Sequence, residues 1–342
     1  MRTEAPLLEV KHLTAYIKTP KGEIRPVQDV SFSIGRGEIV ALVGESGSGK
    51  TVSSLSIVGL NTKAIQYRPE SSILFEGRDL LKLPEKELRI IRGRDIGMIF
   101  QDPMSFLNPV HPIGKQIAES LVIHQKISYA RAKKKALEML QKVGIPDAER
   151  RLNDYPHQLS GGMRQRVMIA AALACSPKLL IADEPTTALD VTIQAQILDL
   201  LKELQRETGI SILLVTHDLG VVAEVADRVI VMYCGKIVEE GEAERIFEKP
   251  VHPYTRGLLD SIPPLYGPSP EKLKAIPGVV PNLLELPAGC RFSTRCSRAS
   301  SQCFEREPDL TRHPSGNRVS CWHPLEEEGE RADGAKSIAR LS

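Results

Sequence analysis

The chain has 342 residues, which is enough for one large domain and a smaller appendage. Its 45 basic and 43 acidic residues nearly cancel, so composition gives no electrostatic footprint for bulk binding to nucleic acid. No apolar run approaches the ~20 residues that span a bilayer, and the start lacks the apolar stretch of a secretory signal. We therefore expect any membrane role to come through partner subunits.

The predicted elements begin with two alternating segments, Leu7–Tyr16 and Arg25–Ile34, which read as strands joined by a turn. An apolar strand at Glu38–Val43 then leads into a glycine-rich loop and a helical pattern at Lys50–Leu60. Strands alternating with helices predict a mostly parallel sheet covered on both faces, with an antiparallel edge. Further buried strands are expected at Ser72–Phe75, Ile96–Phe100, Leu179–Asp183, Ser211–Thr216 and Val229–Tyr233.

The middle and end of the chain differ in texture. The stretch from about Ile113 to Leu173 is interpreted as a helical insertion, and Asp190–Thr208 repeats apolar residues at helical spacing. From Lys249 onward, closely spaced prolines predict a linker that leads into a cysteine-rich stretch. After Pro324 the chain is charged and poor in apolar residues, which is typical of disorder.

A glycine-rich loop, Gly-Glu-Ser-Gly-Ser-Gly-Lys-Thr, ends at Thr51 and fits the G-x-x-x-x-G-K-[ST] pattern between a predicted strand and helix. Glycines let backbone N–H groups wrap phosphates, and a helix N-terminus adds partial positive charge. Lys50 would neutralise the terminal phosphates, and the Thr51 hydroxyl would face Mg²⁺. The residues expected to bind phosphate here are Gly44, Ser46, Gly47, Ser48, Gly49, Lys50 and Thr51.

The apolar strand Leu179–Asp183 ends in the carboxylate of Asp183, and a second carboxylate, Glu184, follows directly. A buried strand that delivers a carboxylate beside a phosphate loop can hold Mg²⁺ or its water shell, a role that we assign to Asp183. Glu184 would then orient the attacking water or accept its proton. Apolar strands often end in acids, so the pattern takes its meaning from the phosphate loop upstream.

A second candidate anion site, Leu-Ser160-Gly161-Gly162, stands before that strand and is followed by Gln165. Ser160 can cap the next helix, and the helix dipole favours an anion. This segment resembles the signature of the ABC ATPase family, LSGG followed by a glutamine. The resemblance implies that Ser160, Gly161, Gly162 and Gln165 close over ATP held by a partner chain, so that two ATPase domains sandwich two nucleotides.

Other segments resemble the same family in the expected order. Gln101, between Phe100 and Asp102, is similar to the glutamine that contacts Mg²⁺ or water and senses the membrane subunits. The segment Ala188-Leu189-Asp190 resembles the loop that crosses the dimer interface, and His217 resembles the switch histidine at the γ-phosphate. Tyr16 stands where the family places a ring that stacks on adenine.

The resemblance thus assigns a role to each candidate residue. The catalytic residues would be Lys50, Gln101, Glu184 and His217, and the Mg²⁺ ligands would be Thr51, Gln101 and Asp183.

The segment Val-His-Pro-Tyr-Thr-Arg-Gly-Leu-Leu, which starts at Val251, is similar to one found in ATPases of dipeptide, oligopeptide and nickel importers. The resemblance implies an α/β fold of the P-loop NTPase class: a mixed sheet core with a helical subdomain, an antiparallel β edge and a small cysteine-rich C-terminal extension. We expect a nucleotide-binding domain over residues 1–258, with a helical subdomain at about 103–175, then an extension over 259–324 and a disordered tail over 325–342.

The implied function is ATP hydrolysis that energises import of di- or oligopeptides, with nickel or another small solute as the alternative cargo. The companions in that branch are a second, paralogous ATPase chain, two integral membrane permease subunits and an extracytoplasmic solute-binding protein. The chain would sit peripherally on the cytoplasmic face of the inner membrane, without a nucleic-acid partner.

Four cysteines, Cys290, Cys296, Cys303 and Cys321, crowd into the C-terminal stretch with the spacing C-x5-C-x6-C-x17-C. This spacing lacks the paired knuckles of structural zinc and differs from ferredoxin spacings. Some members of the peptide-importer branch carry a [4Fe–4S] cluster, so the resemblance favours one here, with Arg291, Arg295 and Arg298 offsetting its charge. Zinc, or reduced cysteines without metal, remain alternatives. Cys175 and Cys234 are expected in the core.

Three other classes of protein are alternatives to a transport ATPase. A nucleic-acid ATPase of the same superfamily usually carries a long coiled coil between the two nucleotide motifs, and no sustained heptads lie between Thr51 and Ser160. Translation-associated ABC proteins contain two cassettes in one chain, and this chain has one. A phosphate-loop kinase outside the family is disfavoured by the signature segment.

Overall fold

The computed structural model describes residues 5–187, 189–262 and 275–326, and these residues form two compact units. The helical unit contains Ile34–Glu38 and Lys82–Val215, and the β-rich unit contains Leu8–Ser33, Ile39–Leu81 and the described residues from Thr216 onward. Each unit therefore draws on segments that are distant in sequence. From residue 327 onward, the charged tail predicted after Pro324 lies outside the described residues.

Three parallel strands organise the helical unit. β7 (Ile96–Ile99) pairs with β8 (Leu179–Asp183), and β8 pairs with β9 (Ser211–Thr216) in parallel register. All three strands are buried along their length, which explains why they read as continuous apolar runs rather than alternating ones. The bounds predicted for β8 and β9 are confirmed, and β7 ends one residue earlier than predicted.

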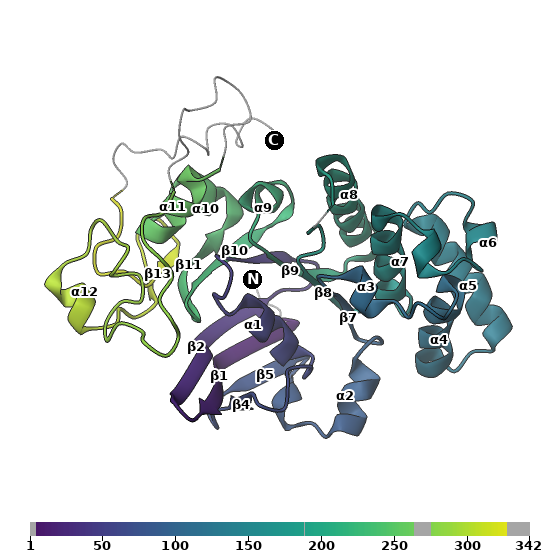
Figure 1. Cartoon of the computed structure of the whole chain (residues 1–342), viewed down its shortest axis with the longest axis horizontal. Coiled ribbons are helices and arrows are strands. Elements are labelled where there is room, and N and C mark those ends of the chain that lie inside the picture. The colour runs from purple at the N-terminus through teal and green to yellow at the C-terminus, as the bar shows by residue number, and fades with distance from the viewer. Residues whose placement is uncertain (1–4, 188, 263–274, 327–342) are drawn as a thin grey trace. The chain divides into compact units, whose positions relative to one another are not determined.

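Helices make up most of the remaining helical unit, and Figure 1 shows α4, α5, α6 and α7 gathered together. In α8 the apolar positions Ile197, Leu200, Leu201 and Leu204 are buried at helical spacing, as predicted, whereas Ile193 is half-buried. The helices are α2 (Glu85–Ile91), α3 (Pro103–Phe106), α4 (Ile113–Gln125), α5 (Tyr129–Lys142), α6 (Ala148–Arg151), the 3₁₀ turn η2 (Pro156–Gln158), α7 (Gly161–Leu173) and α8 (Val191–Thr208).

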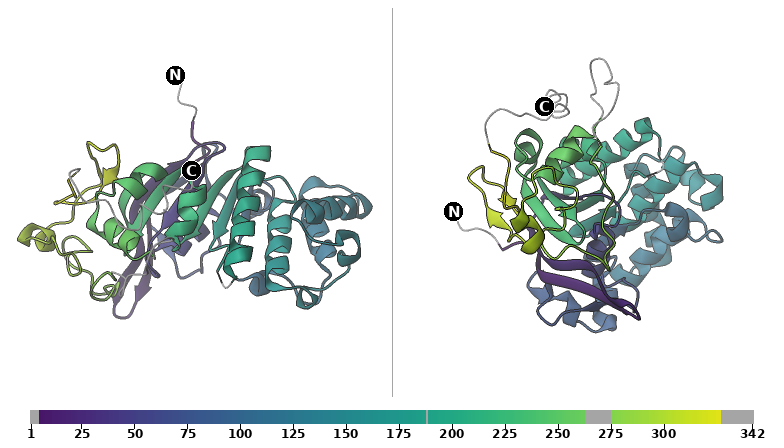
Figure 2. Two further views of the ribbon diagram at one scale, coloured as in Figure 1. Left: turned by 90° about the horizontal axis from the view of Figure 1, so that it is seen from above. Right: turned by 60° about the vertical axis from the view of Figure 1, so that its left-hand side comes forward.

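The β-rich unit contains an antiparallel sheet made by the first strands (Figure 2). These strands form a sheet of their own, in the order β2-β1-β5-β6, with β4 also paired to β1. β1 pairs antiparallel with β4 and β5, and β5 pairs antiparallel with β6. The strands are β1 (Leu8–Thr19), β2 (Gly22–Ile34), β4 (Gln66–Tyr67), β5 (Ser72–Phe75) and β6 (Arg78–Asp79), followed by the 3₁₀ turn η1 (Leu80–Lys82).

A second sheet of the β-rich unit runs in the order β12-β13-β11-β10-β3. β3 (Ile39–Val43) and β10 (Arg228–Tyr233) are parallel, whereas β10 and β11 (Lys236–Glu242) are antiparallel. The short strands β13 (Arg318–Val319) and β12 (Thr311–Arg312) continue the sheet from β11. The cysteine-rich extension therefore contributes β12 and β13 to the same sheet as β3, the strand that leads to the phosphate loop.

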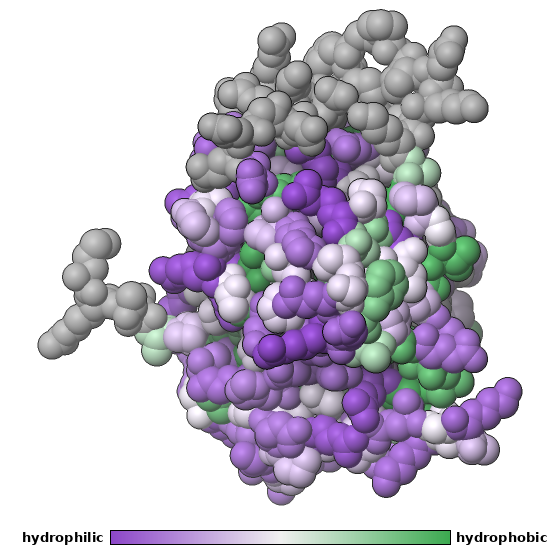
Figure 3. Space-filling view, turned by 90° about the vertical axis from the view of Figure 1, so that its left-hand side faces the viewer, coloured by the Kyte–Doolittle hydropathy of each residue, from purple (hydrophilic) through white to green (hydrophobic). Residues whose placement is uncertain are grey.

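Where the structure describes the β-rich unit, five α-helices accompany its sheets, and α10 and α11 stand beside β11 in Figure 1. A hydrophobic core joins β3, β10 and α11 with Phe292 from the extension. The face that carries the extension is mostly hydrophilic, with hydrophobic residues in small patches (Figure 3). The helices are α1 (Lys50–Ile57), α9 (Leu219–Val225), α10 (Ala243–Glu248), α11 (Pro253–Asp260) and α12 (Ser301–Glu305).

No helix in the described part of the chain combines the length and the apolar character that a membrane span requires.

Candidate functional site

The phosphate loop lies in the β-rich unit between β3 and α1, the strand-to-helix context that its motif requires. Gly44 and Gly49 have φ angles of 150° and 101°, in the region that favours glycine. A Cβ at Gly44 would collide with the carbonyl oxygen of Met232, and one at Gly49 would collide with that of Pro26. Glycine at both positions thus lets the loop pack against the backbone of neighbouring strands.

Lys50 opens α1, and its side chain is buried within the loop. Its Nζ donates hydrogen bonds to the carbonyl oxygens of Gly44 over 2.7 Å and Glu45 over 3.1 Å. The Ser48 carbonyl oxygen accepts a hydrogen bond from the Gly235 amide over 2.8 Å, which ties the loop to the turn after β10. The conformation of the loop is therefore stabilised by hydrogen bonds from its own Lys50 and by a hydrogen bond to the turn after β10.

The remaining phosphate-loop candidates differ in their exposure to solvent. Ser46, Gly47 and Thr51 are exposed, whereas Ser48 and Gly49 are buried. Gly47 has a φ angle of 77° and no atom within 4 Å of the position that a Cβ would take. Its conformation, rather than crowding, accounts for glycine there.

Two other candidates belong to the β-rich unit. His217 is exposed and directly follows β9, where Asp218 caps α9 by accepting hydrogen bonds from two backbone amides. Tyr16 lies on β1 and is 9% exposed, with the Arg68 guanidinium 4.2 Å from the centre of its ring. The predicted stacking of Tyr16 on adenine stays a prediction.

In the helical unit, β8 delivers Asp183 and Glu184. Asp183 is 4% exposed, and Glu184 has a φ angle of 49°, which is uncommon for a residue with a side chain. The Glu184 amide donates to the Val215 carbonyl oxygen over 2.8 Å, which holds this bend against β9. The Glu184 carboxylate accepts hydrogen bonds from the Gln101 amide over 2.8 Å and the Thr187 hydroxyl over 2.9 Å. The structure thus brings together two of the predicted catalytic residues.

The signature segment forms the start of α7 in the same unit. Ser160 caps the helix, with its Oγ accepting a hydrogen bond from the Met163 amide over 3.3 Å. Gln165 is buried, and its side-chain amide donates to the Pro185 carbonyl oxygen over 2.5 Å. Since Pro185 follows Glu184, this bond connects the signature helix to the acidic strand end.

Gly162 makes a close approach to α8, where a Cβ would lie 2.7 Å from Cγ2 of Ile193. Asp190 caps α8 by accepting a hydrogen bond from the Ile193 amide over 3.0 Å. Of the predicted interface loop, Leu189 and Asp190 are described, and Ala188 lies outside the described residues.

Comparison with known proteins identifies the family. Residues 27–187 match the family described as "ABC transporter", and residues 238–303 match "Oligopeptide/dipeptide transporter, C-terminal region". The chain is 53% identical over 336 residues to the oligopeptide transport ATP-binding protein OppD of Bacillus subtilis, which covers 98% of this chain and 94% of that protein. The chain belongs to the ABC transporter family. The predicted family and α/β fold are therefore confirmed.

Further relatives agree with this assignment. The oligopeptide transport ATP-binding protein AppD of Bacillus subtilis is 53% identical to this ABC transporter chain over 326 residues, covering 95% of this chain and 99% of AppD. Among solved structures, the ATP-binding cassette MJ0796, a dimer in a post-hydrolysis state bound to ADP and Pi, is similar with a TM-score of 0.62 and 32% identity. That match covers 69% of this chain and 98% of the cassette.

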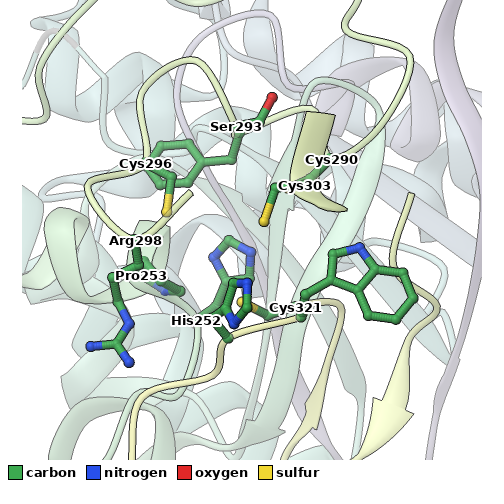
Figure 4. A pocket seen from close by; sticks show the side chains of 11 residues that line it. His252, Pro253, Cys290, Ser293, Cys296, Arg298, Cys303 and Cys321 are labelled. Carbon is green, nitrogen blue, oxygen red and sulfur yellow. The ribbon is translucent and has the colours of Figure 1, made fainter. Parts of the chain in front are cut away.

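The four clustered cysteines of this ABC transporter chain line one pocket in the β-rich unit, together with His252 and Arg298 (Figure 4). Burial raises the pKa of the Cys290 thiol to about 11 and that of Cys321 to about 12. A thiolate at these positions therefore needs compensation by a cation or a metal. Among the described residues, no three His, Cys, Asp or Glu side chains are grouped so that they could hold a metal ion.

The three arginines near these cysteines make different contacts. Arg298 lines the pocket, whereas the Arg291 guanidinium donates to the Cys234 carbonyl oxygen and to the Gln28 side chain. Arg295 forms an ion pair with Glu45, a residue of the phosphate loop. Of the three arginines expected to offset charge at the cysteines, only Arg298 lines the pocket, and the expected role stays a prediction. Cys175 and Cys234 are buried, as predicted.

Proposed function

We propose that this chain is the ATP-hydrolysing subunit of an importer of di- or oligopeptides. The observation that carries the proposal is the 53% identity to oligopeptide transport ATP-binding proteins over nearly the whole chain, including the C-terminal region that gives the second family its name. Import of nickel or another small solute by the same ATPase is the alternative cargo. An ABC-type nucleic-acid ATPase is disfavoured by the same relatives.

The phosphate loop is the proposed binding site for the triphosphate of ATP. Its backbone amides and the N-terminus of α1 favour the triphosphate, and Lys50 would exchange its carbonyl partners Gly44 and Glu45 for phosphate oxygens. Tyr16 would stack on adenine. The complete set proposed to contact ATP within one chain is Tyr16, Gly44, Ser46, Gly47, Ser48, Gly49, Lys50 and Thr51.

The residues proposed to hold Mg²⁺ are Thr51, Gln101 and Asp183. Their hydroxyl, amide and carboxylate oxygens are the hard donors that this ion prefers, so the donor set fits. Because the amide nitrogen of Gln101 donates to Glu184, its amide oxygen is the atom that a cation would contact. Bound with ATP, Mg²⁺ would neutralise charge on the phosphates.

Glu184 is the proposed residue that orients the attacking water or accepts its proton, and His217 would contact the γ-phosphate. Support comes from the hydrogen bonds of Glu184 to Gln101 and Thr187, which fix the direction of its carboxylate. A carboxylate held in this way loses little freedom when the water binds. Gln101 would then couple the state of the site to the membrane subunits.

Each ATP site is proposed to be completed by another chain, whose helix equivalent to the one beginning after Ser160 covers the nucleotide. Support comes from the position of Ser160 at the N-terminus of α7, where the helix dipole favours an anion, and from the dimeric state named for the MJ0796 cassette. We propose a paralogous ATPase as the companion, with Ser160, Gly161, Gly162 and Gln165 forming the covering segment of this chain.

We further propose two integral membrane permeases and an extracytoplasmic solute-binding protein as partners, with the chain at the cytoplasmic face of the inner membrane. Family membership implies membrane permease partners. ATP-driven closing of the two ATPase domains, and their opening after hydrolysis, would switch the permeases between two states.

For Cys290, Cys296, Cys303 and Cys321 we propose a [4Fe–4S] cluster, with zinc as the alternative. Support comes from the donor type alone: four soft thiols line one pocket with Arg298, which would offset negative charge, although the described side chains are not grouped as a metal site. Anaerobic purification followed by iron, sulfide and zinc assays tests this. About four irons and four sulfides per chain support the cluster, whereas one zinc or no metal contradicts it.

The transport proposal is tested by isolating the chain from membranes with its companions and reconstituting the complex in vesicles. A peptide-loaded binding protein should raise ATP turnover and drive peptide from its own side of the membrane into the compartment that contains the ATPase. Stimulation by nickel-loaded receptor instead would select the alternative cargo, and recovery of the chain with DNA would contradict the proposal.

A further inference from the structure

Glu45, the second residue of the phosphate loop, is held through its amide, its carbonyl and its side chain. Its backbone amide donates to the Tyr254 hydroxyl over 2.9 Å, and its carbonyl oxygen accepts from Lys50 over 3.1 Å. Its carboxylate forms a two-pronged ion pair with Arg295, over 2.6 and 3.1 Å. Two of these three partners come from the C-terminal region, more than 200 residues along the chain.

The Arg295 side chain is 4% exposed and that of Glu45 is 29% exposed, so the ion pair is shielded from water on the arginine side. The guanidinium also donates to the Pro277 carbonyl oxygen over 2.9 Å and lies 3.3 Å from the Tyr233 hydroxyl. A two-pronged pair between arginine and a carboxylate fixes direction as well as distance. Removal of the Glu45 carboxylate leaves the buried Arg295 charge uncompensated, which is costly.

Three aromatic rings keep these partners in place. Tyr233, Tyr254 and Phe292 pack against one another, with ring centres 4.7 to 5.3 Å apart. Tyr254 belongs to α11, and Phe292 belongs to the turn that continues to Arg295. The Tyr254 hydroxyl and the Arg295 guanidinium are thus presented to the loop by a rigid core rather than by mobile chain.

We propose that Tyr254 and Arg295 are positioning residues for the phosphate loop, through which the C-terminal region sets the affinity of the chain for ATP. The inference rests on the proposed binding of ATP by this loop. A loop that is already ordered loses less entropy when it wraps a phosphate, so its binding is tighter. Both residues act through Glu45 and need no contact with the nucleotide.

Tyr254→Phe isolates one hydrogen bond, because it removes the hydroxyl and keeps the ring within the aromatic core. Arg295→Met removes the ion pair. Arg318→Met is the matched control, since Arg318 pairs with Glu240 in the same C-terminal region. The binding of a fluorescent ATP analogue to the full chain, and KM and kcat for ATP in the purified transporter complex, are measured for each variant.

Tyr254→Phe and Arg295→Met should each weaken ATP binding about tenfold, the size of an ordinary coupling between two sites. KM for ATP should rise, with kcat changed less. Arg295→Met combined with Glu45→Gln should bind no more weakly than Arg295→Met alone, because both act on one contact. Arg318→Met should bind ATP like the unmodified chain.

Equal affinity of Tyr254→Phe and the unmodified chain for the analogue would overturn the inference, even where Arg295→Met fails to fold. Full additivity of Arg295→Met and Glu45→Gln would overturn the role given to the ion pair. Failure of the unmodified chain to bind ATP contradicts the proposed function instead, so the two failures are distinguishable.

Discussion

The side-chain amide of Gln101 donates a hydrogen bond over 2.8 Å to the carboxylate of Glu184, a residue 83 positions further along the chain. The bond joins the second residue after β7 to the first residue after β8, and these two neighbouring strands are parallel. The carboxyl ends of such strands meet at one edge of the sheet, where α/β proteins place ligands. The proposed water-orienting residue is therefore fixed by the proposed sensor of the membrane subunits.

Lys50→Ala should weaken the binding of the terminal phosphates of ATP. The loss of a charged hydrogen-bond donor predicts ATP binding weakened by about 10- to 100-fold, with the fold retained. Titration with a fluorescent ATP analogue measures the affinity. Lys63→Ala, which removes an exposed lysine of the same unit, is the control and should leave affinity unchanged. Tight binding by the Lys50 variant would remove the loop from its proposed role.

Gly162→Ala should lower the free energy of unfolding by about 1–3 kcal/mol, because its Cβ would press on the branched side chain of Ile193. Gly161→Ala is a matched control one position earlier, where the nearest atom to the new Cβ is 3.8 Å away. Thermal unfolding of the two variants without nucleotide gives the comparison. Equal melting temperatures would show that α7 and α8 are not in tight contact at Gly162.

Glu239→Ala should destabilise the β-rich unit by about 3 kcal/mol. Glu239 is fully buried in β11, where its carboxylate accepts hydrogen bonds from the backbone amides of Val251 and His252 and from the Asn317 side chain. The variant leaves these donors buried without a partner, which costs about 1–3 kcal/mol for each. Chemical denaturation measures the loss.

The control for Glu239→Ala is Glu242→Ala, since the Glu242 side chain is 61% exposed and pairs with Arg245 at the surface. It should change stability by less than about 0.5 kcal/mol. A similar loss in both variants would contradict the structural role given to Glu239.

Much of the fold follows from local pattern. The strands β5, β8 and β9 have the predicted bounds because short apolar runs are bounded by turns or polar residues. β11 was not predicted, because its sequence, Lys-Ile-Val-Glu-Glu-Gly-Glu, is rich in acids, and one of them, Glu239, is buried through bonds to distant residues. The two-residue strands β12 and β13 are too short to leave any periodic signal.

The candidate site divides in the same way. Residues within motifs, such as Lys50, Ser160 and Glu184, were recognised because spacing and local context carry their signal. The roles of Tyr254 and Arg295 at Glu45 were not recognised, because a contact between residues 209 or 250 positions apart leaves no local pattern. The motif around Tyr254 predicted only a turn and a short helix, and Arg295 was assigned to the cysteines.

The central claim, that ATP held at Lys50 is covered by the Ser160 helix of another chain, is tested by ATP-dependent association in solution. With Glu184→Gln to prevent hydrolysis, the ATPase chain and its companion should form a stable complex on addition of ATP, seen by light scattering after size exclusion. Adding Ser160→Arg to both chains at the matching position should abolish that association while each chain still binds ATP. Undiminished association of the Ser160→Arg chains would contradict the account.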